Sequence, residues 1–418
     1  MTGRHFSRVL RTTILLAAAL GLALGANAVP AWATTIISSS TISQNTTWTA
    51  AGSPYVLNVD VTVASGATLT IQPGVIVKAG GYDPFSMRSL KIASGATLNA
   101  QGTAEAPIYF TSIRDDSVGG DTGGDGPTSC SRGNWGQITL SSVNANVISY
   151  ATIRCGGTAN SPSILGLVSL TTGAALTLSL VTLAHANKPG VYGVGANLDA
   201  DHVDVSDVTS GIYIKSNSFA AISYSTVQGL TQGNGLRAED STIEADHNTI
   251  TENWIGVAVL LSATTTAGGS SFYNNTIANN TADGVDFQGL NNWASVPPES
   301  QWPIGHGNNI YGNRSTYTDH YQLDTPNTTL GDSSPSWDGN YWGDSVTEVS
   351  NPEECQEVFY PDHYTGYVWA IPGVSAASPG WYDSVWVPDR EDPEHRPPKL
   401  CVRTFANLED WSSTPFTW

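Results

Sequence analysis

The chain has 418 residues and a formal net charge of −19 at pH 7, because 36 Asp and Glu outnumber 17 Lys and Arg. Such an acidic surface repels nucleic acid and anionic membranes, which excludes both as expected partners.

The first 33 residues have the pattern of a secretory signal peptide. Arg4, Arg8 and Arg11 precede an apolar run, and Ala31-Trp32-Ala33 forms a small-x-small cleavage site, with Ala26-Asn27-Ala28 as a competing one. Removing three Arg leaves 14 basic against 36 acidic residues, or about 22 net negative charges in the mature chain. No later stretch reaches the roughly 18 apolar residues of a membrane span. We therefore expect a protein secreted to the extracellular space.

From Pro54 onward the sequence predicts short β-strands. Apolar residues at 57, 59, 61 and 63 alternate with polar ones, which is the period of a half-buried strand. The segment Ala64-Ser-Gly-Ala-Thr-Leu69 recurs as Ala93-Ser-Gly-Ala-Thr-Leu98, and Pro73-Gly74 marks a turn. The fold is expected to be all-β.

An Asp-Gly-rich loop follows at residues 115–126. Asp115, Asp116, Asp121 and Asp125 offer oxygen ligands on a chain that glycines let fold tightly, so Ca²⁺ is the one cofactor the sequence suggests. The loop lacks the spacing and closing Glu of an EF-hand, and an ordinary flexible loop is the alternative.

Four cysteines lie two in each half of the chain. In an oxidising compartment we expect Cys130 to pair with Cys155 and Cys355 with Cys401. Zinc is a weaker alternative, because no Cys-x-x-Cys is present and the His residues are scattered.

Five frames beginning with glycine, at residues 190, 211, 235, 256 and 284, align as successive coils. Val191, Ile212, Leu236, Val257 and Val285 then form an inward aliphatic column. The outward row reads Tyr192, Tyr213, Arg237, Ala258 and Asp286, with Lys215, Glu239, Leu260 and Gln288 beside it. The sequence places the candidate site on this row.

Two columns of asparagine recur with these frames. Asn248 and Asn253 are each followed by another Asn 27 residues later and by a third 33 residues after that. This periodicity indicates a solenoid. Identical amides stacked at the strand spacing of about 4.8 Å can hydrogen-bond along the stack, so we expect a structural role for them.

Tryptophans are concentrated late in the chain. The insert from Gly289 to Gly307 contains Trp293 and Trp302, which either bind sugars or plug the end of the core. The aromatic-rich extension at 314–418 is either a cap over the exposed solenoid end or a small carbohydrate-binding region. The predicted domains are thus a signal peptide at 1–33, a β-helix at 34–313 and this extension.

Residues 50–345 resemble bacterial secreted right-handed parallel β-helix repeat proteins of the pectate-lyase-like superfold. The matching motifs are Leu69-Thr-Ile-Gln-Pro-Gly-Val-Ile-Val-Lys78, Pro107-Ile-Tyr-Phe-Thr-Ser112, the Asp-Gly loop, Gly133-Asn-Trp-Gly136 and Asn340-Tyr-Trp-Gly-Asp344. These motifs specify the fold rather than the activity, because the superfold hosts lyases, hydrolases, epimerases and adhesins. The resemblance implies a right-handed parallel β-helix.

Two catalytic chemistries are open at the outward row. The resemblance implies that a lyase would use Lys215 or Arg237 as base, with calcium-bound Asp neutralising a uronate. A hydrolase would use Glu239 and Asp286, which lie two coils apart, about 9.6 Å along the axis, a separation that suits an inverting mechanism. The alternative is that Lys215, Arg237 and Glu239 only form surface ion pairs across neighbouring coils.

We therefore expect a monomeric protein that acts on an extracellular polysaccharide, as a lyase or glycoside hydrolase, with Tyr192, Tyr213, Trp293 and Trp302 contacting the sugar. The overall negative charge favours a neutral glycan, or an anionic one bridged by calcium. The alternative from another class is a non-catalytic adhesive or scaffold protein that binds carbohydrate with the same face.

Overall fold

The computed structural model describes residues 34–80, 87–262, 265–289 and 301–313, and the backbone of four short strands at 323–324, 356–357, 382–387 and 399–404. The predicted signal peptide at 1–33, the ring of Trp293 and the Cys355–Cys401 pair lie outside the described residues, except for the backbone of Cys401. In the part of the chain described, no helix is long and apolar enough to cross a membrane.

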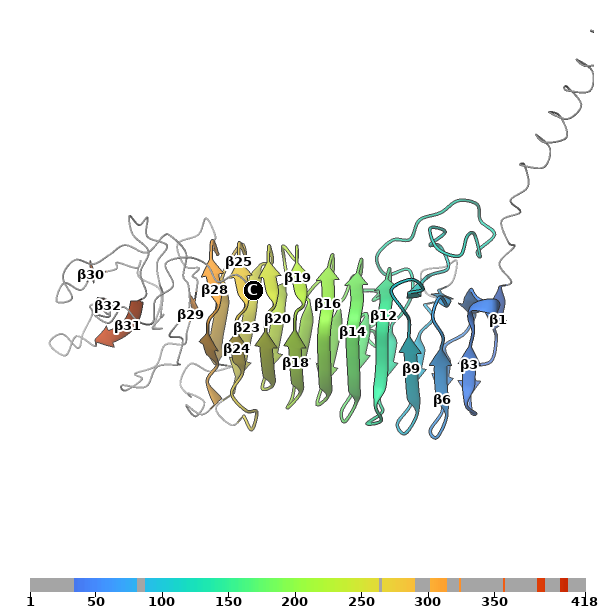
Figure 1. Cartoon of the computed structure of the whole chain (residues 1–418), viewed down its shortest axis with the longest axis horizontal. Coiled ribbons are helices and arrows are strands. Elements are labelled where there is room, and N and C mark those ends of the chain that lie inside the picture. Colours follow the sequence, from blue (N-terminus) through green and yellow to red (C-terminus); the bar gives the residue numbers. More distant parts are fainter. Residues whose placement is uncertain are drawn as a thin grey trace, which may run out of the picture. The chain divides into compact units, whose positions relative to one another are not determined.

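Two long parallel sheets, here called sheet A and sheet B, contain nearly all the described strands (Figure 1). Sheet B comprises β2 (Thr41–Ile42), β5 (Val61–Val63), β8 (Leu90–Ile92), β11 (Ile138–Leu140), β13 (Val168–Leu170), β15 (Val191–Val194), β17 (Ile212–Lys215), β20 (Asn234–Glu239), β23 (Ile255–Leu261), β26 (Val285–Gly289) and β29 (Leu323–Asp324).

Sheet A supplies the other two sides of each coil. It comprises β1 (Thr35–Ile37), β3 (Thr46–Trp48), β4 (Tyr55–Leu57), β6 (Thr68–Ile71), β7 (Ile76–Ala79), β9 (Thr97–Gln101), β10 (Ile108–Ser112), β12 (Asn146–Arg154), β14 (Ala175–Ala184), β16 (Asn197–Ser206), β18 (Phe219–Ser223), β19 (Thr226–Gln228), β21 (Thr242–Asp246), β22 (Thr249–Thr251), β24 (Ser271–Tyr273), β25 (Thr276–Ala278), β27 (Ile304–His306) and β28 (Asn309–Tyr311). A short 3-10 helix, η1 (Ala50–Gly52), lies between β3 and β4.

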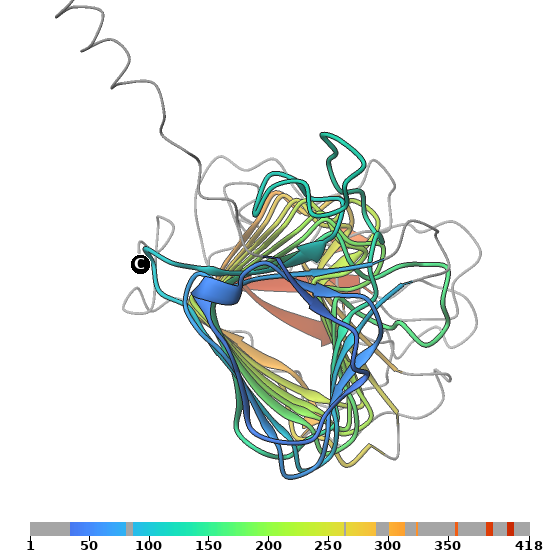
Figure 2. The same ribbon diagram turned by 90° about the vertical axis from the view of Figure 1, so that its right-hand side faces the viewer.

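From β12 onward, one residue with positive φ makes the bend between the two sheet-A sides. In β12 and β14 this residue is Tyr150 or Leu180, and the strand continues through it. In the later coils His202, Tyr224, His247 and Asn274 take the same backbone conformation. Because the coils from β12 onward bend at the same point, their successive strands superimpose when the described coils are viewed from the end (Figure 2).

The core is a set of aliphatic columns inside the coils. Val191, Ile212, Leu236, Val257 and Val285 are all fully buried, and the strand pairings place them in one register. The predicted inward column is therefore confirmed. Burying such side chains contributes about 1.5 to 3 kcal/mol each.

Both asparagine columns are buried hydrogen-bonded ladders. Asn248 Nδ2 donates to Asn275 Oδ1 at 2.9 Å, and Asn275 Nδ2 donates to Asn308 Oδ1 at 3.0 Å. In the second column Asn280 Nδ2 donates to Asn313 Oδ1 at 2.7 Å. These amides also bond backbone groups of neighbouring coils, so their predicted structural role is confirmed.

The described strands also extend past the predicted boundary at residue 313. β29 pairs in parallel with β26 and adds a strand to sheet B. Farther along, β30 (Gln356–Glu357), β31 (Tyr382–Val387) and β32 (Lys399–Thr404) form a separate antiparallel sheet. The change from parallel to antiparallel pairing distinguishes this part of the extension from the coils.

Candidate functional site

The predicted outward row exists on sheet B. The strand register pairs Tyr192 with Tyr213, Tyr213 with Arg237, Arg237 with Ala258, and Ala258 with Asp286. Lys215 pairs with Glu239 in the adjacent row. The glycine-based alignment of these coils was therefore correct, and Tyr192, Tyr213, Lys215, Arg237 and Glu239 form one surface, here called the aromatic patch.

Each tyrosine ring of the aromatic patch has a cation from the next coil against it. The Tyr192 and Tyr213 rings meet edge to face with centroids 5.0 Å apart. Lys215 Nζ lies 5.7 Å from the Tyr192 centroid, and the Arg237 guanidinium carbon lies 5.1 Å from the Tyr213 centroid. These cation–π contacts hold the rings on the surface of the sheet.

Arg237, Glu239 and Tyr213 are electrostatically coupled. Arg237 Nε donates to Glu239 Oε1 at 2.9 Å, and Arg237 Nη2 bonds the same oxygen. Burial, together with its hydrogen bond to the Glu239 carboxylate, raises the pKa of Tyr213 to about 12. At neutral pH the Tyr213 hydroxyl therefore stays protonated and acts as a hydrogen-bond donor.

The expected ion pairs across coils take a different form. Arg237 pairs with Glu239 two residues along its own strand, because alternate side chains share one face of a sheet. Lys215 lies over the ring of Tyr192 in the neighbouring coil. The charges are thus arranged around the two tyrosines.

The two candidate catalytic carboxylates have different surroundings. The side chain of Glu239 is 17% exposed and is bonded to Arg237. Asp286 is 6% exposed, and the buried Ala258 lies between it and Arg237 in the row. Two strand steps separate Glu239 on β20 from Asp286 on β26, as the sequence predicted, or about 9.6 Å along the axis.

Trp302 differs from its predicted role in sugar binding. It is 4% exposed and belongs to the core, where its ring lies 6.4 Å from that of Phe287. A buried ring has no open face on which a sugar can stack. Of the two functions considered for this residue, the structure therefore favours plugging the core.

In the Asp-Gly loop the candidate calcium ligands already accept hydrogen bonds. Asp115 accepts from Thr111, Ser117 and Arg154. Asp116 Oδ2 accepts from Thr128, and Asp121 accepts from the amides of Gly124 and Gly126.

Charge pairing anchors this loop to the sheet. Burial alone would raise the pKa of Asp115, but the donors Ser117, Thr111 and Arg154 lower it overall. Beneath the loop the buried Lys78 donates to the Gly120 carbonyl at 2.6 Å. No pattern in the sequence indicated this Lys78 contact, because it depends on how the loop folds back over β7.

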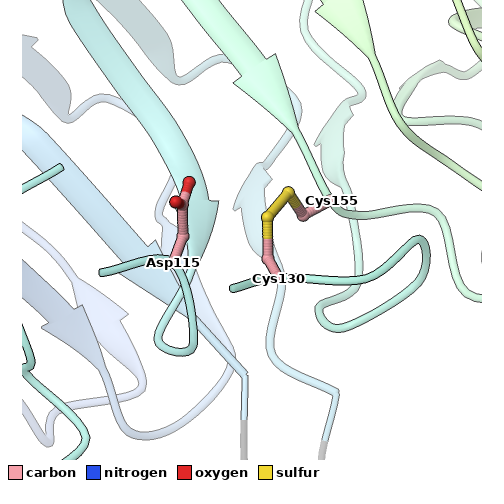
Figure 3. Close-up of side chains that lie close together, drawn as sticks. All are labelled: Asp115, Cys130 and Cys155. Atoms are coloured by element: carbon pink, nitrogen blue, oxygen red, sulfur yellow. A yellow bond between two sulfur atoms is a disulfide. The ribbon is translucent and has the colours of Figure 1, made fainter. Parts of the chain in front are cut away.

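Cys130 and Cys155 form the predicted disulfide, with Cα atoms 5.9 Å apart. Their sulfur atoms and a carboxylate oxygen of Asp115 lie within 4.8 Å of one another (Figure 3). Sulfurs bonded to each other are not thiolates, and Asp115 is bonded to Arg154, so this cluster is a covalent anchor of the loop rather than a metal centre.

The same outward row continues toward the N-terminus, which the sequence alignment missed. Tyr192 pairs with Ser169, Ser169 with Thr139, and Thr139 with Lys91. Long insertions separate these coils, and their strands lack the opening glycine that aligned the later frames. Only the hydrophobic alternation around each residue could have indicated the continuation.

Comparison with protein families agrees with this architecture. A model of the pectate-lyase-like β-helix domain matches residues 40–206, and a model of the right-handed β-helix region matches residues 189–329. The chain is a right-handed parallel β-helix repeat protein. For this β-helix protein, a search of curated proteins found no match.

Among solved structures, the β-helix protein is similar to a crystal structure of a mutant of the periplasmic alginate epimerase AlgG. The two share 10% sequence identity, with a TM-score of 0.26, over 69% of this chain and 77% of the other. A similarity at this level carries no conclusion about activity.

Proposed function

We propose that the protein is secreted and binds an extracellular polysaccharide with the aromatic patch of sheet B. The observation that carries this proposal is the pair of surface tyrosines held by Lys215 and Arg237. Tyrosine rings offer apolar faces and edges to sugar rings, while the Tyr213 hydroxyl and the cations supply hydrogen-bond donors for sugar oxygens.

The proposal includes turnover by a lyase or hydrolase. As a lyase, the protein would use Lys215 or Arg237 against the proton next to a uronate carboxylate. As a hydrolase, it would use Glu239 and Asp286 on either side of a glycosidic bond. The pectate-lyase-like fold supports both chemistries without choosing between them.

A non-catalytic binding protein is the second candidate, and one observation favours it. The carboxylate of Glu239 is bonded to Arg237, and Asp286 is buried, so both proposed acids are engaged or shielded. The patch therefore supports binding more directly than cleavage.

One experiment separates the two. The purified protein is incubated with plant and microbial glycans, with and without calcium, and new reducing ends and absorbance from unsaturated uronates are measured. Turnover that falls by orders of magnitude in Ala variants at one or two of Lys215, Arg237, Glu239 and Asp286, with folding intact, supports the enzyme. Retention on a glycan with no product from any of them supports the binding protein.

A further inference from the structure

A pocket lies on the same face of sheet B, on strands two and three steps from β15 of the aromatic patch toward the N-terminus. It is a pocket of about 560 Å³, lined by β8 and β11, by Asp60 and by the loop that follows Gly157. Lys91 and Thr139, which line it, belong to the same outward row as Tyr192 and Tyr213.

One loop separates this pocket from the patch. Asn160 and Ser163 line the pocket on one side of the loop. On the other side, a β-carbon added to Gly166 would lie 3.0 Å from Cβ of Tyr192, so the loop backbone packs directly on that residue. Gln137 holds the loop in place, because its side chain bonds the Ser163 carbonyl and the Leu165 amide. The pocket and the patch thus share a wall.

The lining of the pocket is polar but electrically balanced. Lys91 Nζ and Asp60 Oδ2 are 2.6 Å apart, so the single cation and the single carboxylate among the lining residues form an ion pair. The other polar groups are hydroxyls and amides of Ser, Thr, Asn and Gln. Thr139 Oγ1 is buried and has no hydrogen-bond partner among the described residues.

Such a lining fits an uncharged polyhydroxyl ligand. Hydroxyls and amides both donate and accept, as sugar hydroxyls do. A uronate carboxylate would meet Asp60 beside Lys91, and repulsion would offset the attraction. No aromatic ring is among the lining residues, so recognition would come from hydrogen bonds rather than from stacking.

We propose that this pocket is a second saccharide-binding site, selective for neutral sugar units, and that one glycan chain occupies it together with the aromatic patch. This inference rests on the proposed function of the patch. Three strand steps separate Lys91 from Tyr192, or about 14 Å along the axis. A glycan long enough to reach both sites gains affinity over a short one, because its second contact is intramolecular.

The test measures affinity against glycan length. Neutral gluco-, manno- and xylo-oligosaccharides, from disaccharide to hexasaccharide, are titrated calorimetrically into the wild type and into variants that fill the pocket. Ser163→Trp is the first variant, and Asn160→Trp, from the same loop, is the second in case the first does not fold. Ser179→Trp on β14 of sheet A is the matched control.

We expect the hexasaccharide to bind the wild type at least about tenfold more tightly than the disaccharide. The pocket-filling variants should lose that gain and keep disaccharide binding at the patch, while Ser179→Trp keeps both. A gain with length that survives both pocket-filling variants would overturn the second site and leave the proposed function standing. Tighter binding of an oligogalacturonate of equal length, lost in Ser163→Trp, would overturn the selectivity for neutral sugars. No binding of any glycan would overturn the proposed function itself.

Discussion

The asparagine ladders and the aromatic patch are built by the same stacking of coils, yet their sequences behave in opposite ways. In the ladders one residue type repeats from coil to coil, and the members are buried and bonded to each other. In the outward row that carries the patch the residues are Tyr, Tyr, Arg, Ala and Asp, so the residue type changes at three of the four steps. A residue type that repeats from coil to coil thus indicates a buried hydrogen bond that each coil makes with the next. An outward row is not constrained by such a bond, so its side chains can differ and can bind a ligand.

The largest effect should come from breaking a ladder. In Asn275→Ala, the Asn248 amide groups and Asn308 Oδ1 lose a partner inside the core. Each buried group left unsatisfied costs about 1 to 3 kcal/mol, so we expect the free energy of unfolding to fall by about 3 kcal/mol in denaturant titrations. Asn99→Ala, on the outer face of β9, should change it by less than about 0.5 kcal/mol. If both variants lost the same free energy of unfolding, the ladder would have no special role in stability.

A smaller effect is expected from breaking the patch. Arg237→Met removes the guanidinium from Tyr213 and Glu239, and we expect glycan affinity to fall about tenfold, or about 1.4 kcal/mol. Stability should change by less than about 1 kcal/mol, because the pair is partly exposed. Arg132→Met breaks another ion pair, with Asp207, and serves as the matched control. A fall in glycan affinity in the control as large as in Arg237→Met would contradict a specific role of the patch.

The coupling at Tyr213 predicts a pH effect. Its folded pKa of about 12 is above the ordinary value of 10.0, so the stabilisation is complete below pH 10 and is lost as pH rises toward 12. Ultraviolet titration of tyrosinate should show one group with a midpoint near 12 that is missing in Tyr213→Phe. If the group missing in Tyr213→Phe instead has a midpoint near the ordinary value of 10.0, Tyr213 is not coupled to Glu239.

The smallest effect is expected from calcium, which the sequence suggested as a ligand of the Asp-Gly loop. Three of the four candidate Asp residues already accept hydrogen bonds from the protein. A cation would have to displace those donors, so we expect calcium or a chelator to leave Tm unchanged. A rise in Tm with calcium that disappears in Asp121→Asn would instead establish a site in this loop.

Periodic features were readable from the sequence, and irregular ones were not. The Asn columns and the glycine-opened frames predicted the register of β15, β17, β20, β23 and β26, because an inward column must repeat at the coil spacing. The sequence did not decide between burial and sugar binding for Trp302, because this residue lies in a long insert with no period. The pocket was missed for a similar reason, since its wall is an insertion held by Gln137.

The most direct test of the account is retention of the protein on immobilised glycans when two surface tyrosines are removed together. Tyr192→Ala/Tyr213→Ala should lose retention while its circular dichroism stays that of the wild type. Tyr224→Ala, which removes a tyrosine that is 53% exposed on sheet A, should keep retention. Unchanged retention of the double variant, or loss of retention in Tyr224→Ala alone, would contradict the assignment of sheet B as the glycan-binding face.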